Sequence, residues 1–310
     1  MRNDINEQKA VIIGCGMVGS TIAYTLMQSG TFSQIVLIDS DEERLCGEVM
    51  DLGNGIPFMD GVNVYAGNYD DIKDAFLVII SAGASQKPGE SRMDLLETNV
   101  KIYREIISKI NDSGFKGNIL IASNPVDILT YVAQEMSNLP YNRVLGTGTV
   151  LDTARLKYEI GKELAVNSRN IHAMIVGEHG DREIALFSSA NVSGIPLLEY
   201  PSREPVNKEK LLTRIRNYAY EIIKRKKATY YGIAMAVKRI AEALVRDEKA
   251  ILPVSTRVED EDGEVVLSVP SVISKNGARY IEEYPMSEDE KAELENLKNE
   301  MKRIYKLMEK

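Results

Sequence analysis

The residues best suited to acid–base chemistry form the short segment Gly177-Glu178-His179-Gly180-Asp181, which follows a predicted apolar strand. It contains one of only two histidines in the 310-residue chain. Because the pKa of imidazole, about 6.5, lies near neutrality, His179 is a suitable proton carrier for interconverting a ketone and an alcohol. A lone histidine in a loop is more often an exposed or capping residue, so this segment alone leaves catalysis open.

A second candidate group is the pair Asp152 and Arg155, which stand three positions apart in the predicted helix from Leu151 to Gly161. That spacing places both side chains on one face of the helix. The carboxylate could orient a protonated imidazole, and the guanidinium could bind a substrate carboxylate through two parallel hydrogen bonds. A plain surface ion pair is the alternative, and the spacing does not separate the two.

A third candidate is the segment from Ala82 to Arg92, which contains glycine and proline and follows the apolar run Leu77 to Ser81. Ligands bind at the carboxyl ends of the strands in parallel sheets, so a lid carrying Arg92 could form here. Taken alone, the segment could equally be an ordinary surface loop.

The dinucleotide-binding pattern Gly14-Cys15-Gly16-Met17-Val18-Gly19 joins the first predicted strand to a helix. Gly14 permits a tight turn, Gly16 lets the backbone approach a pyrophosphate, and Gly19 allows the helix to pack closely on the strand. Asp39 ends the second strand, 20 residues after Gly19, where it can accept hydrogen bonds from a ribose and repel a 2′-phosphate. The cofactor expected from these residues is NAD, and a Gly-rich turn beside a solvated aspartate is the alternative.

The order of the predicted elements indicates an α/β fold. Short apolar runs alternate with amphipathic helices up to about Thr149, which is typical of a doubly wound parallel sheet. The runs are Ala10–Ile13, Ile35–Ile38, Asn63–Ala66, Leu77–Ser81, Asn118–Ala122 and Arg143–Gly146. We therefore expect an NAD-binding Rossmann domain at residues 1–147, followed by an α+β substrate-binding catalytic domain at 148–310.

The second half changes in character. After the helix that begins near Leu151 we expect a strand at Ala173–Val176 and a long helical region from Asn207 to Arg246. Strands at Ile251–Val258, Val265–Pro270 and Arg279–Glu283 follow, with turns at Asp262-Gly263 and Asn276-Gly277, and a charged helix from Glu288 to Glu309 ends the chain.

Composition narrows the function class. The net charge of −8 argues against nucleic acid or an anionic membrane as the main partner. Cys15 and Cys46 form no C-x-x-C pair, and no apolar run approaches the roughly 18 residues of a membrane span. We expect a cytoplasmic protein without a metal site.

Six ordered motifs resemble the L-lactate and malate dehydrogenase family, with the bacterial lactate branch most similar. Besides Gly14–Gly19 and Gly177–Asp181, they are Ser81–Leu95, Ser123–Leu129, Gly146–Arg155 and Ala228–Ala234. The resemblance implies that His179 is the acid/base held by Asp152, that Arg155 anchors the substrate carboxylate, and that Arg92 polarises the keto group. It also places Gln86, Asn124 and Thr229 at the substrate. The implied NAD contacts are Gly14, Gly16, Met17, Val18, Gly19, Asp39, Gly83, Asn99, Ser123 and Asn124.

Within this resemblance, Gln86 favours lactate over malate because malate enzymes carry an arginine at that lid position. A neutral amide would leave the second carboxylate of oxaloacetate buried without a counter-charge. L-Lactate dehydrogenase activity in glycolysis and fermentation is therefore expected. Malate dehydrogenase and the hydroxyisocaproate type remain the alternatives.

Two departures from the family pattern concern Lys227 and Lys157. Lys227 precedes Ala228-Thr229 where relatives usually have glycine, which puts the local backbone near the pocket in question. Lys157 stands where many relatives activated by fructose 1,6-bisphosphate have an arginine, while the companion His172 is present. The resemblance implies a homotetramer and leaves allosteric activation by this sugar phosphate open.

Two rivals belong to other classes. An NAD-dependent glycosidase would need a catalytic metal held by Cys and His, and the chain offers no such pair. A non-catalytic relative, such as a recruited lens crystallin, is disfavoured by the intact set of His179, Asp152, Arg155 and Arg92.

Overall fold

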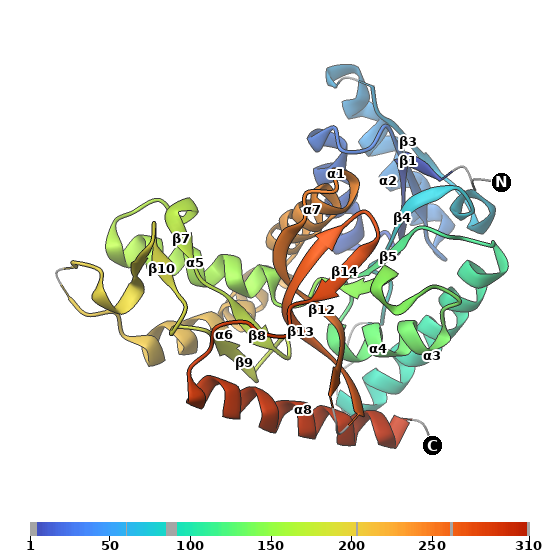
Figure 1. Ribbon diagram of the computed structural model, residues 1–310. Coiled ribbons are helices and arrows are strands. Elements are labelled where there is room, and N and C mark those ends of the chain that lie inside the picture. Colours follow the sequence, from blue (N-terminus) through green and yellow to red (C-terminus); the bar gives the residue numbers. More distant parts are fainter. Residues whose placement is uncertain (1–4, 60, 85–91, 203, 261–262, 309–310) are drawn as a thin grey trace.

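The computed structural model describes residues 5–59, 61–84, 92–202, 204–260 and 263–308 (Figure 1). Side chains of residues 92–94, 260, 307 and 308 lie outside this description.

Six parallel strands form the N-terminal sheet, and this confirms the predicted doubly wound fold. They are β1 (Asn6–Ile13), β2 (Gln34–Ile38), β3 (Asn63–Ala66), β4 (Ala75–Ile80), β5 (Asn118–Ile121) and β6 (Val144–Gly146), in the order β3-β2-β1-β4-β5-β6. The reversal of order at β1 and β4 opens a crevice at the carboxyl ends of these strands, where ligands bind in such sheets.

Alternating residues of each strand enter two different cores. Val11 and Ile13 of β1 pack in one core with residues of α3 (Arg92–Asp112) and α4 (Val126–Met136). Ala10 and Ile12 face the opposite core, which contains residues of α1 (Met17–Ser29), α2 (Glu42–Gly55) and α7 (Tyr231–Val245). Because both faces are covered, the strands read as continuous apolar runs.

The sheet continues into the second half of the chain through a long antiparallel hairpin. β12 (Ala250–Asp260) pairs with β6 at Ser255 and Gly146, and β13 (Gly263–Ser274) pairs with β8 (Ile175–Gly177) at Ser268 and Gly177. The hairpin stands between the parallel strands and the lobe that contains α5 (Val150–Leu164) and α6 (Lys208–Lys226) (Figure 1). It therefore brings the ends of β6 and β8 into one neighbourhood.

The remaining elements are distributed over both halves of the chain. They are the strands β7 (Ile171–His172), β9 (Glu183–Ala185), β10 (Asn191–Val192), β11 (Ile195–Pro196) and β14 (Gly277–Tyr280), the helix α8 (Glu288–Met308), and the short 3-10 helices Ile56–Phe58, Tyr69–Ile72, Tyr141–Arg143, Ser168–Asn170 and Leu197–Glu199.

Three predicted elements were wrong in extent. The helical region from Asn207 to Arg246 is two helices, because Lys227 adopts a left-handed φ of 73° and ends α6. The strand placed at Arg279–Glu283 is β14, which begins at Gly277 because the turn before it sets the pairing of Ser274 with Gly277. The strand placed at Ala173–Val176 is β8, which begins only at Ile175 and pairs with β9 and β13, while the separate strand β7 ends at His172 and pairs with β10.

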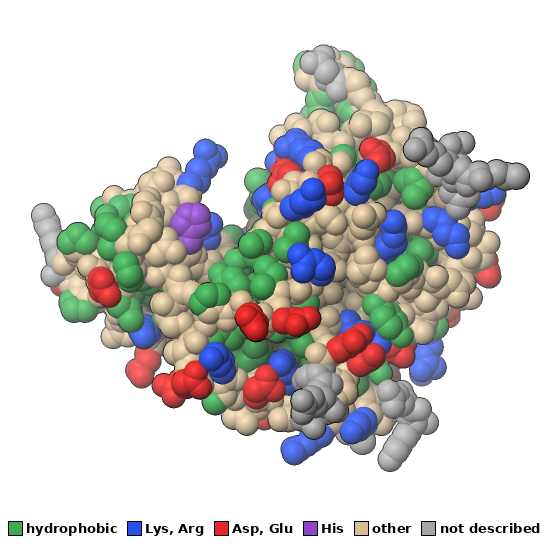
Figure 2. All heavy atoms as spheres, viewed as in Figure 1, with side chains coloured by type: hydrophobic (Ala, Val, Ile, Leu, Met, Phe, Trp, Pro, Cys, Tyr) green, Lys and Arg blue, Asp and Glu red, His purple; other side chains and the backbone are tan. Residues whose placement is uncertain are grey.

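No helix within the described ranges is long and apolar enough to cross a membrane. On the face shown in Figure 2, acidic and basic side chains are interspersed along the lower edge, which α8 forms.

Candidate active site

The predicted catalytic residues meet where the hairpin brings β8 beside α5. His179 follows β8, while Asp152 and Arg155 lie one turn apart on α5. The Nδ1 atom of His179 lies 2.6 Å from Asp152 Oδ2, and Arg155 Nη1 donates to Asp152 Oδ1 at 2.7 Å. The Asp152 side chain is 2% exposed, against 11% for Arg155 and 23% for His179. A buried carboxylate therefore joins a more accessible imidazole to a guanidinium, which a plain surface ion pair would not do.

The negative charge of Asp152 and the positive charges of His179 and Arg155 stabilise one another. Burial alone would raise the pKa of Asp152, but the charges and hydrogen bonds of His179 and Arg155 outweigh it and lower that pKa. Burial alone would lower the pKa of His179, but the charge and hydrogen bond of Asp152, together with the charge of Asp127, raise it to about 9. His179 is therefore mainly protonated at neutral pH and ready to donate a proton.

Asp127 is a buried acid that the sequence reasoning missed. Its Oδ2 accepts the backbone N–H of His179 at 2.9 Å, and its Oδ1 accepts the hydroxyls of Ser255 at 2.7 Å and Ser268 at 2.9 Å. Burial raises its pKa to about 6 against the lowering effect of these three donors. An aspartate inside the apolar run from Val126 to Leu129 was the available signal, because an acid is rarely buried without partners.

Glu183, also missed, lies on β9 directly opposite Gly177 of β8. It is 2% exposed, and its Oε1 has no hydrogen-bond partner. Burial, followed by the neighbouring charge of Asp152, raises its pKa to about 8. Glu183 is therefore mainly neutral at neutral pH.

The geometry of the Gly-rich turn fits a dinucleotide. A Cβ added to Gly19 would lie 1.8 Å from the carbonyl oxygen of Gly14, so only glycine lets α1 pack this closely on β1. A Cβ on Gly16 would meet nothing within 4 Å, which leaves open space at the start of α1, where Met17 is exposed and Val18 half-buried. A cavity of about 540 Å³ lies here, with Gly14, Gly16, Asp39, Arg44 and Gly83 among its lining residues.

Asp39 lies just after β2, at the edge of this cavity. Its Oδ2 accepts the N–H of Cys15 at 2.5 Å, and its Oδ1 accepts the N–H of Asp41 at 2.9 Å and Nη2 of Arg44 at 3.0 Å. Burial alone would raise the pKa of Asp39, but these partners lower it. A charged carboxylate therefore faces the position where the adenosine ribose is expected.

The polar residues after β4 and β5 form a connected group. Asn99 is 2% exposed, accepts the N–H of Ala84 at 2.8 Å and donates to the carbonyl of Asn124 at 3.3 Å. The Ser123 hydroxyl donates to the carbonyl of Ala82 at 2.6 Å, while the Asn124 side chain is exposed. A Cβ on Gly83 would lie 3.3 Å from Asn99 Oδ1. Asn99 and Ser123 therefore tie the start of the predicted lid to β5.

The described structure does not test three of the predicted substrate residues. Gln86 lies outside the described residues, and so does the side chain of Arg92, the first residue of α3. Thr229 is half-buried in the connection between α6 and α7.

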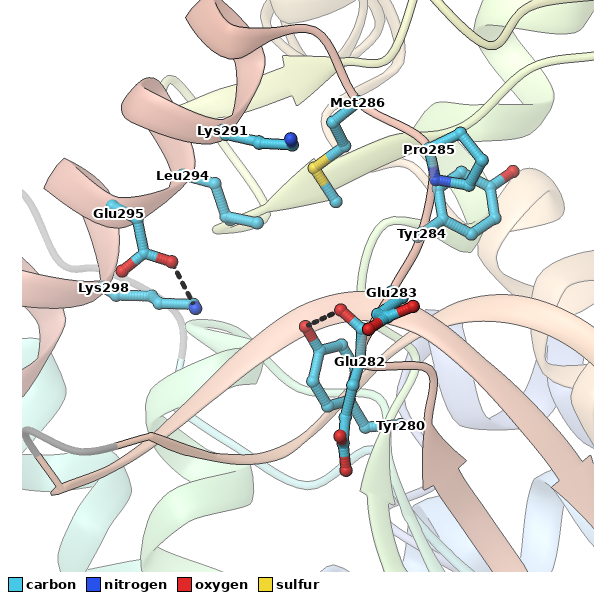
Figure 3. Close-up of a pocket in the computed structure, with 10 residues that line it drawn as sticks. All are labelled: Tyr280, Glu282, Glu283, Tyr284, Pro285, Met286, Lys291, Leu294, Glu295 and Lys298. Carbon is cyan, nitrogen blue, oxygen red and sulfur yellow. Dashed lines mark hydrogen bonds and ion pairs between the residues drawn. The ribbon is translucent and has the colours of Figure 1, made fainter.

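Two hollows lie apart from this cluster. Lys157 and His172 share one with Arg239, Asn191 and Ser189, and burial lowers the pKa of Lys157. The other lies between α8 and the segment after β14 (Figure 3). Glu295 and Lys298 form a 2.6 Å ion pair there, and none of the predicted site residues lines it.

Sequence profiles of two domains match nearly the whole chain. The lactate/malate dehydrogenase NAD binding domain matches residues 8–146, and the lactate/malate dehydrogenase alpha/beta C-terminal domain matches residues 149–310. The chain belongs to the lactate/malate dehydrogenase family. This lactate/malate dehydrogenase is therefore an NAD-dependent oxidoreductase, as its sequence predicted.

Similar proteins agree with the family. The chain is 45% identical to an L-lactate dehydrogenase of Acetivibrio thermocellus, covering 100% of both chains. It is 44% identical to L-lactate dehydrogenase 2 of Lactococcus lactis, covering 97% of this chain and 98% of the relative. The ligand-bound crystal structure of the minor L-lactate dehydrogenase from Enterococcus mundtii has a TM-score of 0.91 at 44% identity, covering 96% of this chain and 97% of that one.

No group of three or more His, Cys, Asp or Glu side chains in the described part of this dehydrogenase is arranged to hold a metal ion.

Proposed function

We propose that His179 is the proton donor and acceptor of an L-lactate dehydrogenase reaction and that Asp152 holds it in place. The activity is reversible reduction of pyruvate to L-lactate with NADH. The observation that carries the assignment of His179 is the buried Asp152, which contacts both His179 at 2.6 Å and Arg155 at 2.7 Å. One carboxylate thereby sets the distance between the proton carrier and the proposed substrate anchor.

The residues of the cavity beside α1 would hold NAD. Gly14, Gly16, Met17, Val18 and Gly19 would lie along the pyrophosphate, where the free N–H groups of the helix start favour an anion. Asp39 would accept the ribose hydroxyls, and Gly83, Asn99, Ser123 and Asn124 would lie toward the nicotinamide. Bound NADH supplies the hydride.

The other side chains bind and orient the keto acid. Arg155 binds its carboxylate through two parallel hydrogen bonds, which fixes the keto carbon relative to His179. His179 donates its proton to the keto oxygen, and Asp152 stabilises the imidazole in both charge states. Arg92 stabilises negative charge on the same oxygen, while Asn124 and Thr229 complete the pocket.

The test measures NADH oxidation with pyruvate, oxaloacetate and 2-ketoisocaproate in parallel. In His179→Asn we expect kcat for pyruvate to fall by at least about 10²-fold with NADH binding retained, because a general acid is lost. His172→Asn, assayed without fructose 1,6-bisphosphate, is the matched control, since it removes the other, exposed histidine of β7. Turnover of His179→Asn at the level of the control would remove His179 from the mechanism.

Gln86 is proposed to select pyruvate over oxaloacetate. In Gln86→Arg, a guanidinium would pair with the second carboxylate of oxaloacetate and would face the methyl group of pyruvate unpaired. We expect the oxaloacetate-to-pyruvate ratio of kcat/KM to rise roughly a thousandfold, which corresponds to about 4 kcal/mol. Gln86→Asn is the control for a change of lid side chain without charge. A rise below tenfold in a folded, NADH-binding variant would remove Gln86 from the specificity site.

We further propose that fructose 1,6-bisphosphate binds beside Lys157 and His172 and that the protein is a cytoplasmic homotetramer. Arg239 lines the same hollow and adds a positive charge suited to a phosphate. Activation would appear as a lower KM for pyruvate with millimolar fructose 1,6-bisphosphate. An unchanged KM at pH values on both sides of the histidine titration would reject activation, and gel filtration would test the tetramer.

A further inference from the structure

We propose that Asp127 is a positioning residue that fixes the loop carrying His179 through its backbone, and that Ser255 and Ser268 hold Asp127 in place. This proposal rests on the proposed role of His179.

The first support is the direction of the hydrogen bonds. The described partners of the Asp127 side chain all donate to it: the His179 N–H and the hydroxyls of Ser255 and Ser268. These donors come from the loop after β8, from β12 and from β13, whereas Asp127 lies in the first turn of α4. Asp127 is 2% exposed, and both serines are fully buried. A carboxylate is the side chain that satisfies several donors at once, and the amino end of a helix favours its charge.

The second support is the backbone around His179. Gly177 has a φ of 97° and Gly180 a φ of 137°, conformations that glycine adopts far more readily than residues with a side chain. The catalytic segment therefore lies between two glycines whose backbone conformation other residues rarely adopt. The Asp127 contact restrains the backbone between them, while Asp152 restrains the ring at Nδ1. Two carboxylates from different helices thus restrain His179, Asp127 at its backbone N–H and Asp152 at its imidazole ring.

The third support is the set of charges around His179. Asp152 and Arg155 face it from α5, Asp127 from α4 and Glu183 from β9, while Tyr305 of α8 faces Asp127. Of these, Asp152 and Asp127 raise the pKa of His179 and Arg155 lowers it. Glu183, whose pKa of about 8 leaves it largely neutral at pH 7, contributes little there. Loss of the Asp127 charge should therefore lower the pKa of His179 and make pyruvate reduction decline at a lower pH.

The experiment compares Asp127→Asn with Asp127→Ala. The amide of Asn keeps an acceptor for the His179 N–H but has no charge, so the pH profile of pyruvate reduction should move to lower pH with a small loss of kcat. Ala removes acceptor and charge, and we expect kcat to fall about 10²-fold from displacement of the proton donor, with KM changed less. Asn restores the packed volume as well as the acceptor, so the shift of the pH profile and the fall in kcat at a nearly unchanged KM, which a packing defect alone would not produce, distinguish positioning from simple core packing. NADH binding and thermal unfolding are measured on each variant.

An independent readout is the titration of His179 itself. With only two histidines in the chain, the 13C-labelled ring of His179 can be assigned by means of His172→Gln. The proposal predicts a lower pKa of His179 in Asp127→Asn. If neither Asp127 variant folds, Ser255→Ala/Ser268→Ala keeps the carboxylate but removes two of its donors, and kcat should fall about tenfold as the Asp127 contact loosens.

An unchanged pKa of His179 together with unchanged kcat in folded variants would overturn the proposal. Unchanged kcat in the double serine variant would do the same if the Asp127 variants do not fold. Failure of the proposed function would look different, because His179→Asn would then retain turnover while the His179 titration still responded to Asp127→Asn.

Discussion

Replacement of Asp152 by asparagine tests the centre of the site most directly. In the native protein one carboxylate accepts from Arg155 at 2.7 Å and contacts His179 Nδ1 at 2.6 Å, and it is 2% exposed. Asparagine has nearly the same shape, so packing changes little. It has no charge, so both cations lose their counter-ion. We expect a folded protein in which His179 is harder to protonate and less well oriented.

The size of the effect follows from the raised pKa. The pKa of His179 goes from an ordinary 6.5 to about 9, mainly through Asp152 against the opposing effect of burial. A tenfold change in protonation corresponds to about 1.4 kcal/mol, so the imidazolium is stabilised by roughly 3 kcal/mol. Without Asp152 the pKa should return to about 6.5 or below, since Arg155 remains nearby. At pH 8 about nine-tenths of His179 would be protonated in the native protein, against about 3% in Asp152→Asn.

The assay is the pH dependence of kcat/KM for pyruvate reduction, followed by NADH absorbance. At pH 8 the change in protonation alone predicts a loss of about 30-fold. At pH 5.5 both proteins are largely protonated, so the loss that remains there reports orientation and the weakened Arg155. Asp181→Asn is the matched control, because Asp181 lies on the same loop but contacts the exposed Tyr220 at 3.2 Å instead of the imidazole.

Two results would refute this reasoning. If Asp152→Asn kept the native pH profile, Asp152 would not set the protonation of the proton donor. If its loss were equal at pH 5.5 and pH 8, the carboxylate would act through geometry alone.

Three further predictions concern other parts of the molecule. Lys227→Gly should raise the unfolding free energy by about 1 kcal/mol by relieving a non-glycine φ of 73°, and Lys227→Ala should not; denaturant unfolding of both checks this. Asp39→Ser should raise the NADPH-to-NADH ratio of kcat/KM about tenfold or more, because it removes the repulsion of the 2′-phosphate and frees Arg44 to bind that phosphate. Adding Arg44→Ala to this variant should lower the ratio again. Because folding raises the pKa of His179, the stability that its protonation contributes is complete below pH 6.5 and is lost as the pH rises to about 9. The free energies of unfolding of the native protein and of His179→Asn should therefore differ less at pH 9.5 than at pH 6.

The sequence by itself determined the elements and their class. Strands buried on both faces must be continuous apolar runs, so β1, β2 and β4 were visible as segments of four or more such residues. The Gly-rich turn was equally visible, because the close approach of Gly19 to Gly14 excludes every larger side chain. The pairing of Asp152 with Arg155 also follows from local spacing, since one helical turn separates them.

Contacts between distant segments were decided only by the tertiary structure. His179 meets Asp152 across 27 positions and Asp127 across 52, and Ser268 meets Asp127 across 141. Spacing over such distances carries no information about contact, because it depends on how the β12–β13 hairpin joins β6 to β8. At Lys227 the only sign of the left-handed turn was the glycine that relatives usually have there, since lysine itself favours helix and gives no local sign of a stop. Local periodicity specifies which face of an element is buried, while the packing of whole elements decides which buried polar groups become partners.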